Sequence, residues 1–210
     1  MSRDKEIIKF RKKRASELKM VAKSLESAFG KNIKTTSILT AAKKLEDDIP
    51  YLGNGSVGSL WGYEINDFKL PVETIKHVRP QGIKTAELTL DMRLVANFDN
   101  WGTLNDPLEE LNFRILIRGI GSTNHYFGLH LDKHDMSKKS NEPHPVYHIQ
   151  YNVNPQKITD FSYGSVLHID TPRLMHYPLD FVLGIGFIIS NFAPQKVNRI
   201  FKDHFFTGPY

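Results

Sequence analysis

Histidine side chains are concentrated in one part of this 210-residue chain, where seven of the nine lie between His125 and His176. Imidazole and carboxylate groups bind zinc, manganese or iron, and they also act as general acids and bases near neutral pH. Polar and apolar residues alternate through this part of the chain, which is the period of a β-strand covered on one side. The alternation predicts a single polar sheet face that carries His130, Asp132, His148, His168 and Asp170.

This polar face has two interpretations. Ligands from neighbouring strands could hold a divalent metal ion, with His130, His148 and His168 as nitrogen ligands, and would then define a metal-dependent hydrolase or nuclease. Polar residues are also expected on the solvent side of any antiparallel sheet. Because no recognised metal motif is present, the sequence favours a solvated or partner-binding face and leaves the catalytic residues unassigned.

The connection between the last predicted strand and the most apolar segment contains a second pair of candidates. Arg173 and His176 precede Pro178, at the start of a predicted helix. Backbone NH groups and the helix dipole favour negative charge there, so the two side chains could bind an anion. A packed, proline-rich connection is the favoured alternative.

Gly53, Gly55 and Gly58 match the spacing of the dinucleotide-binding motif GxGxxG. That motif requires a preceding strand and a following helix. Here a predicted helix and Pro50 come before the glycines. We therefore reject a dinucleotide site and expect a turn or a substrate-facing loop.

Positive charge is concentrated at the start of the chain. Residues 1–34 contain eleven Lys or Arg and four Asp or Glu, a net charge of +7, so the rest of the chain carries −2 of the total of +5. Five of these cations are candidates for contacts to nucleic-acid phosphates: Lys9, Arg11, Lys12, Lys13 and Arg14.

The elements that would position these residues follow from the apolar periods. Helical spacing predicts helices over residues 4–29 and 37–47, the second with Ile38, Leu39, Ala42 and Leu45 inward. Glycine and proline interrupt residues 51–84, where we expect loops and short strands. Alternation then predicts five strands near residues 88–94, 113–118, 127–132, 147–152 and 167–170.

The apolar face of this sheet requires a cover. The segment from Leu179 to Phe192 is apolar nearly all round a helix, and Pro194 separates it from a final amphipathic helix that carries Val197, Ile200 and Phe201. The predicted fold is therefore α+β: N-terminal helices, then an antiparallel meander of about five strands covered on one face by a C-terminal hydrophobic helix. We divide the chain into a basic helical arm, residues 1–50, and a sheet domain, residues 51–210, packed as one unit.

Composition limits the function classes. The chain has no cysteine, which excludes a disulfide framework and a thiol nucleophile and fits a reducing compartment. No secretion signal follows Met1, and the most apolar segment is shorter than the roughly 20 residues of a bilayer span. We expect a cytoplasmic protein without a membrane partner.

Taken together, the sequence favours a non-catalytic accessory or adaptor protein that assembles with a protein partner, in a complex that could include nucleic acid. The first alternative is the metal-dependent hydrolase, with a divalent metal as cofactor. The second is nucleic-acid binding through the basic helix.

Overall fold

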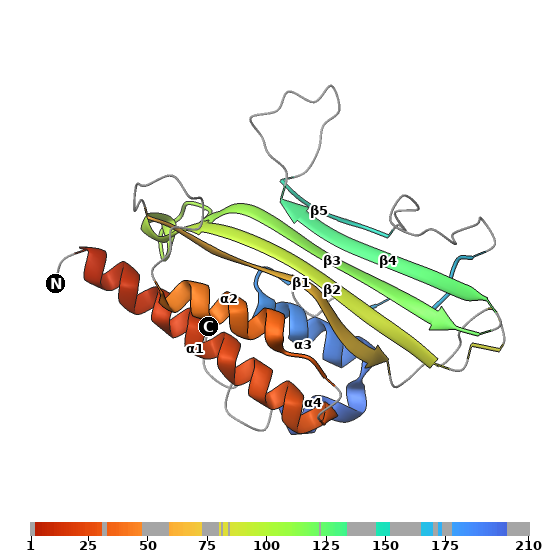
Figure 1. Ribbon diagram of the computed structural model, residues 1–210. Coiled ribbons are helices and arrows are strands. Elements are labelled where there is room, and N and C mark those ends of the chain that lie inside the picture. Colours follow the sequence, from red (N-terminus) through yellow and green to blue (C-terminus); the bar gives the residue numbers. More distant parts are fainter. Residues whose placement is uncertain are drawn as a thin grey trace.

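The computed structural model describes residues 3–30, 33–47, 59–72, 80, 82–83, 85–121, 123–133, 146–151, 165–169, 172–173 and 178–200 (Figure 1). Its main elements are α1 (Arg3–Phe29), α2 (Thr36–Glu46), β1 (Leu60–Val72), β2 (Thr85–Asn97), β3 (Leu108–Ile120), β4 (Asn124–Lys133), β5 (Tyr147–Gln150), α3 (Phe181–Phe192) and α4 (Val197–Ile200). The candidate residues His176 and Asp170, the glycine motif at 53–58 and Phe201 lie outside the described residues.

The five strands form one sheet in the order β1-β2-β3-β4-β5, and every neighbouring pair is antiparallel. This is the predicted meander, in which each strand pairs with the next one along the chain. The helices gather on one face of the sheet (Figure 1). The α+β fold predicted from the sequence is therefore confirmed.

Strand β1 differs from the sequence prediction, which gave only loops and short strands for residues 51–84. Trp61, Tyr63 and Ile65 are buried on the helix side, and after a register shift Phe68 and Leu70 continue that side. The shift inserts a bulge, which breaks the two-residue period that reveals a strand in a sequence. Strand β1 also contains a glycine at a close approach of two backbones: a Cβ on Gly62 would lie 2.3 Å from the carbonyl oxygen of Leu94.

The fifth strand of the sheet is therefore β5, and the strand predicted at residues 167–170 is not one of the five. Val166, just before this segment, instead forms an isolated parallel bridge with Tyr126. Tyr126 N donates to Ser165 O at 2.8 Å, and Leu167 N donates to Tyr126 O at 2.7 Å. The segment thus lies beside the start of β4, whereas β5 pairs with the end of β4.

Helix α3 covers the apolar face of the sheet, as predicted. Phe181 and Phe187 make edge contacts with Phe68 and Phe113, whose ring centroids lie 6.0 and 6.2 Å away respectively. Gly184 permits this contact, because a Cβ there would lie 2.6 Å from the Phe113 ring. The cover is not α3 alone, since buried residues of α1 and α2 belong to the same apolar cluster.

Two details of α2 differ from the sequence prediction. Ile38, Ala42 and Leu45 are buried as expected, but Leu39 is 42% exposed. Ala41 is buried instead, and α2 contacts both α1 and β1. No helix among the described residues is long and apolar enough to cross a bilayer.

Candidate metal centre

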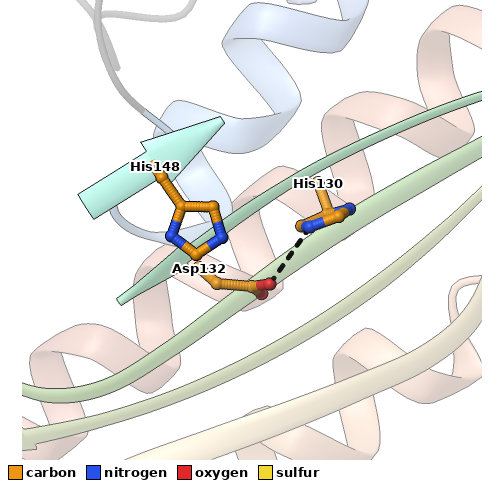
Figure 2. Close-up of side chains that lie close together, drawn as sticks. All are labelled: His130, Asp132 and His148. Atoms are coloured by element: carbon orange, nitrogen blue, oxygen red, sulfur yellow. Dashed lines mark ion pairs between the residues drawn. The ribbon is translucent and has the colours of Figure 1, made fainter. Parts of the chain in front are cut away.

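The site is built by the pairing of β4 with β5. These strands are antiparallel, and their register places Asp132 directly opposite His148 and His130 opposite Gln150. His130 and Asp132 are two residues apart, so they point to the same face of β4. Cross-strand neighbours on one face lie close enough for their side chains to meet. The three side chains therefore converge at the sheet edge (Figure 2).

Donor atoms of these three residues all lie within 4.8 Å of one another. His130 Nε2 is 3.4 Å from Asp132 Oδ2, and the rings of His130 and His148 meet edge to face with centroids 6.0 Å apart. Ligands bound to one zinc at about 2 Å lie within about 4 Å of each other. Small side-chain rotations would therefore bring all three donors onto a single metal ion.

The site is half-buried. The side chains of His130 and Asp132 retain 16% and 20% of their exposure. Asp132 Oδ1 is buried and accepts no hydrogen bond from the described residues. An acceptor removed from water without a donor costs free energy, and coordination of a cation would remove that cost. The carboxylate thus suits a metal ligand.

Two imidazoles and one carboxylate form a ligand set found for zinc, manganese and iron. Three protein ligands leave at least one coordination position for water or substrate, which is the pattern of a catalytic site, whereas structural zinc sites are closed by four protein ligands. Within the described part of the chain, this is the one group of histidine and acidic residues that meets the distance condition.

A cation lies beside this group on the polar face. Arg114 of β3 is the cross-strand partner of His130, and Asp91 of β2 stands opposite Arg114 on its other side. The Arg114 side chain is exposed and forms no ion pair with a residue that the structure describes. Other arginines of this face are paired, Arg93 with Glu110 at 3.0 Å and Arg118 with Glu87 at 3.6 Å. Arg114 is therefore available to an anionic ligand.

Arg114 is a site residue that the sequence does not single out. The alternation places it on the polar side of its strand, together with Arg118. Its position opposite His130 depends on the register between β3 and β4, which the alternation does not contain.

His168 does not join the three ligands. Its segment bridges β4 at Tyr126, and the His168 side chain is exposed outside the group whose donors lie within 4.8 Å. The remaining candidate of the face, Asp170, lies outside the described residues. Three of the five predicted residues are thus brought together.

The five cations of the basic cluster lie on different sides of α1. Lys9, Lys12 and Lys13 are exposed, but Arg11 is only 6% exposed, and its Nη2 donates to Lys44 O at 3.5 Å. Arg14 pairs with Glu17 at 2.9 Å. The two arginines are directed into the protein because they lie on the packed side of α1, so only the three lysines remain exposed candidates for phosphate contacts.

Arg173 is held away from the start of α3. Its backbone NH donates to Asn191 Oδ1 at 2.7 Å, and Asn191 Nδ2 donates to Arg173 O at 3.0 Å. Asn191 belongs to the last turn of α3, whereas an anion site at the helix N-terminus would require Arg173 near Asp180, the N-cap. The carboxylate of Asp180 accepts a hydrogen bond from Leu183 N, so the chain supplies its own anion at this N-terminus.

No protein-family model, curated protein or solved structure matches this chain.

Proposed function

We propose that this protein is a metal-dependent hydrolase whose divalent ion is held by His130, Asp132 and His148. The observation that carries the proposal is the convergence of two imidazoles and a carboxylate within 4.8 Å on the polar sheet face. The buried, unbonded Oδ1 of Asp132 supports it. A bound divalent ion supplies a water molecule of lowered pKa, which is a nucleophile near neutral pH.

The chain's own residues would then have distinct roles. The imidazoles of His130 and His148 bind the ion from neighbouring strands, and Asp132 contributes the negative charge. Arg114, next to His130, binds an anionic group of the substrate. The substrate class that fits this arrangement is an ester that carries an anionic group. A phosphodiester is the leading example.

Metal content tests the proposal directly. We expect the purified protein, loaded with Zn²⁺ or Co²⁺ and dialysed, to retain one equivalent by elemental analysis, and the Co²⁺ form to show visible d–d absorption. His130→Ala, Asp132→Asn and His148→Ala should each lose the metal. His168→Ala is the matched control, because this exposed histidine, predicted for the same face, lies outside the cluster.

Activity is measured separately, with bis(p-nitrophenyl) phosphate as the probe and with EDTA as the control. We expect metal-dependent hydrolysis that is lost in the three ligand variants and weakened in Arg114→Ala. Failure of wild-type protein to retain stoichiometric metal, or equal loss in His168→Ala, would contradict the metal site. Metal retention without hydrolysis of any phosphodiester would contradict the proposed substrate class.

The adaptor role stays an untested prediction, and so does nucleic-acid binding through Lys9, Lys12 and Lys13. A protein that retains no metal but co-purifies with a partner would favour the adaptor. We also propose a cytoplasmic location, and its support is the absence of cysteine.

A further inference from the structure

A cavity of about 900 Å³ lies on the helix-covered side of the sheet, away from the polar face. Its walls come from α1, β1, β2, the β2–β3 connection with the start of β3, the start of β5 and the N-terminal end of α3. Cavities that hold small organic ligands are about 300–1,000 Å³. This cavity therefore has the size of a small-molecule site, and it lies on the other side of the sheet from the proposed metal centre.

Aromatic and aliphatic side chains line most of the cavity. Trp61, Tyr63, Trp101 and Tyr147 supply the rings, and Leu18 and Val182 are among the aliphatic residues. The chain has two tryptophans, and both line this cavity. Trp101 is 43% exposed, so the cavity reaches solvent beside it. The walls suit a mainly apolar ligand.

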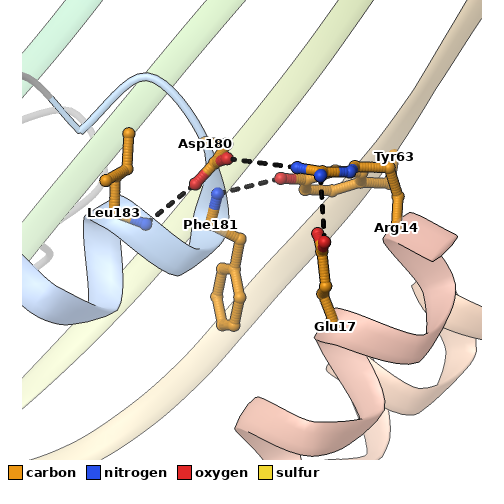
Figure 3. Close-up of polar contacts among 6 residues, drawn as sticks. All are labelled: Arg14, Glu17, Tyr63, Asp180, Phe181 and Leu183. Carbon is orange, nitrogen blue, oxygen red and sulfur yellow. Dashed lines mark hydrogen bonds and ion pairs between the residues drawn. The ribbon is translucent and has the colours of Figure 1, made fainter. Parts of the chain in front are cut away.

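A buried donor in the wall lacks an acceptor. Trp61 is 2% exposed, and its indole Nε1 forms no hydrogen bond with any described residue. The neighbouring Tyr63 differs, because its hydroxyl accepts a hydrogen bond of 2.8 Å from Phe181 N (Figure 3). Buried indole NH groups normally have a partner. The indole NH thus lies in a packed part of the wall, and a ligand oxygen would supply its acceptor once the neighbouring side chains move apart.

Charges around the cavity are balanced. Arg14 lies between Glu17 at 2.9 Å and Asp180 at 4.0 Å (Figure 3), and the exposed Lys13 adds a second positive charge. Asp106, at the other end, is paired with Lys133 at 3.0 Å. The lining thus carries three carboxylates and two cations, and Lys133, outside the lining, neutralises Asp106. The balance therefore favours an uncharged ligand.

We propose that this cavity binds an uncharged, mainly apolar small molecule that carries a carbonyl or similar oxygen as acceptor for the Trp61 indole NH. The aromatic walls supply the area of contact, and the indole NH orients the ligand. Arg14 Nε, also buried and without a hydrogen-bond partner among the described residues, is a second donor that the same side-chain movement would expose to that ligand.

The neutral ketone dye 6-propionyl-2-dimethylaminonaphthalene, known as prodan, tests the proposal with full-length protein. We expect saturable binding of one dye, a blue shift of its emission, and energy transfer from the two wall tryptophans. The anionic dye 1-anilinonaphthalene-8-sulfonate should bind at least about tenfold more weakly. Absence of saturable prodan binding by folded protein, or equal binding of the anionic dye, would overturn the proposal.

Two variants locate the dye. Trp61→Phe keeps an aromatic ring and removes the NH, so prodan should bind about five- to tenfold more weakly. Trp101→Phe is the matched control: it makes the same change at the solvent-exposed mouth and should alter binding less than about twofold. Leu183→Trp adds a ring to the wall and should abolish binding, as read from dye emission. Circular dichroism checks that each variant is folded, and unchanged binding in both Trp61→Phe and Leu183→Trp would place the dye elsewhere and overturn the assignment.

Discussion

Tyr147 and His148 are consecutive residues of β5 that serve opposite faces of the sheet. The hydroxyl of Tyr147 donates a 2.6 Å hydrogen bond to Asp106 Oδ2, whereas His148 stands opposite Asp132 on the polar face. Strand β5 has four residues and a single neighbouring strand, β4. The Tyr147 contact therefore helps to hold the strand that presents a proposed metal ligand.

Tyr147→Phe removes this hydrogen bond and keeps the ring. We expect the free energy of unfolding to fall by about 1 kcal/mol, since this is the usual net contribution of one hydrogen bond. Metal affinity should fall as well, because His148 loses a support of its strand. Denaturant titration and calorimetric metal binding measure the two effects. Tyr151→Phe is the control, because Tyr151 is 49% exposed and its hydroxyl bonds to no described residue; an equal effect in both variants would contradict the role given to Tyr147.

Asp106 gives the same contact a pH dependence. Burial by itself would raise the pKa of Asp106, but hydrogen bonds from Tyr147, from the backbone of Leu108 and from Lys133 outweigh burial and lower the pKa. The ionised carboxyl is therefore favoured in the folded state. Its contribution to stability is present above the ordinary aspartate pKa of about 3.9 and is lost as the pH falls through the lowered folded-state value.

Asp106→Asn tests this dependence. We expect wild-type protein to be more stable than the variant at about pH 7, with the difference narrowing as the pH falls below about 4. Denaturant titrations of both proteins across this range measure it. A stability difference that stays constant with pH would show that the charge of Asp106 contributes nothing to the free energy of unfolding.

Metal binding should also stabilise the fold, because the three ligands come from two strands that are held together only in the folded state. At 100 times its dissociation constant, Zn²⁺ should add about 2.7 kcal/mol to the free energy of unfolding. For a chain of this length, that raises the thermal midpoint by about 5 to 10 °C. Scanning calorimetry with and without EDTA measures the shift. Asp132→Asn should show almost none of it, and a shift of full size in that variant would assign the stabilisation to another site.

The bulge in β1 predicts a backbone effect. Asp67 has φ of 51°, in the left-handed region that β-branched residues avoid, and its NH donates to Asp91 Oδ1 at 2.8 Å. Asp67→Val should destabilise the protein by about 1 to 2 kcal/mol, whereas Asp67→Gly should be tolerated. Denaturant titration compares them. Equal stability of the two variants would show that the bulge is not strained by a branched side chain.

The sequence by itself determined the features that depend on local period. A two-residue alternation assigns side chains to faces strand by strand, and this is enough to place His130, Asp132 and His148 on one face. The apolar segment from Leu179 to Phe192 needed burial on every side, so it had to cover the sheet. The full length of strand β1 was not predicted from the sequence, because its bulge changes the face on which alternate residues lie.

Tertiary structure decided the features that depend on distance along the chain. The β4–β5 register sets Asp132 opposite His148, and the bridge at Val166 leaves His168 outside the group. Packing of α1 turned Arg11 and Arg14 inward and away from the exposed lysines. Alternation is a property of each strand alone, but register and helix packing join segments that are far apart in the sequence, so only the folded chain brings three ligands together.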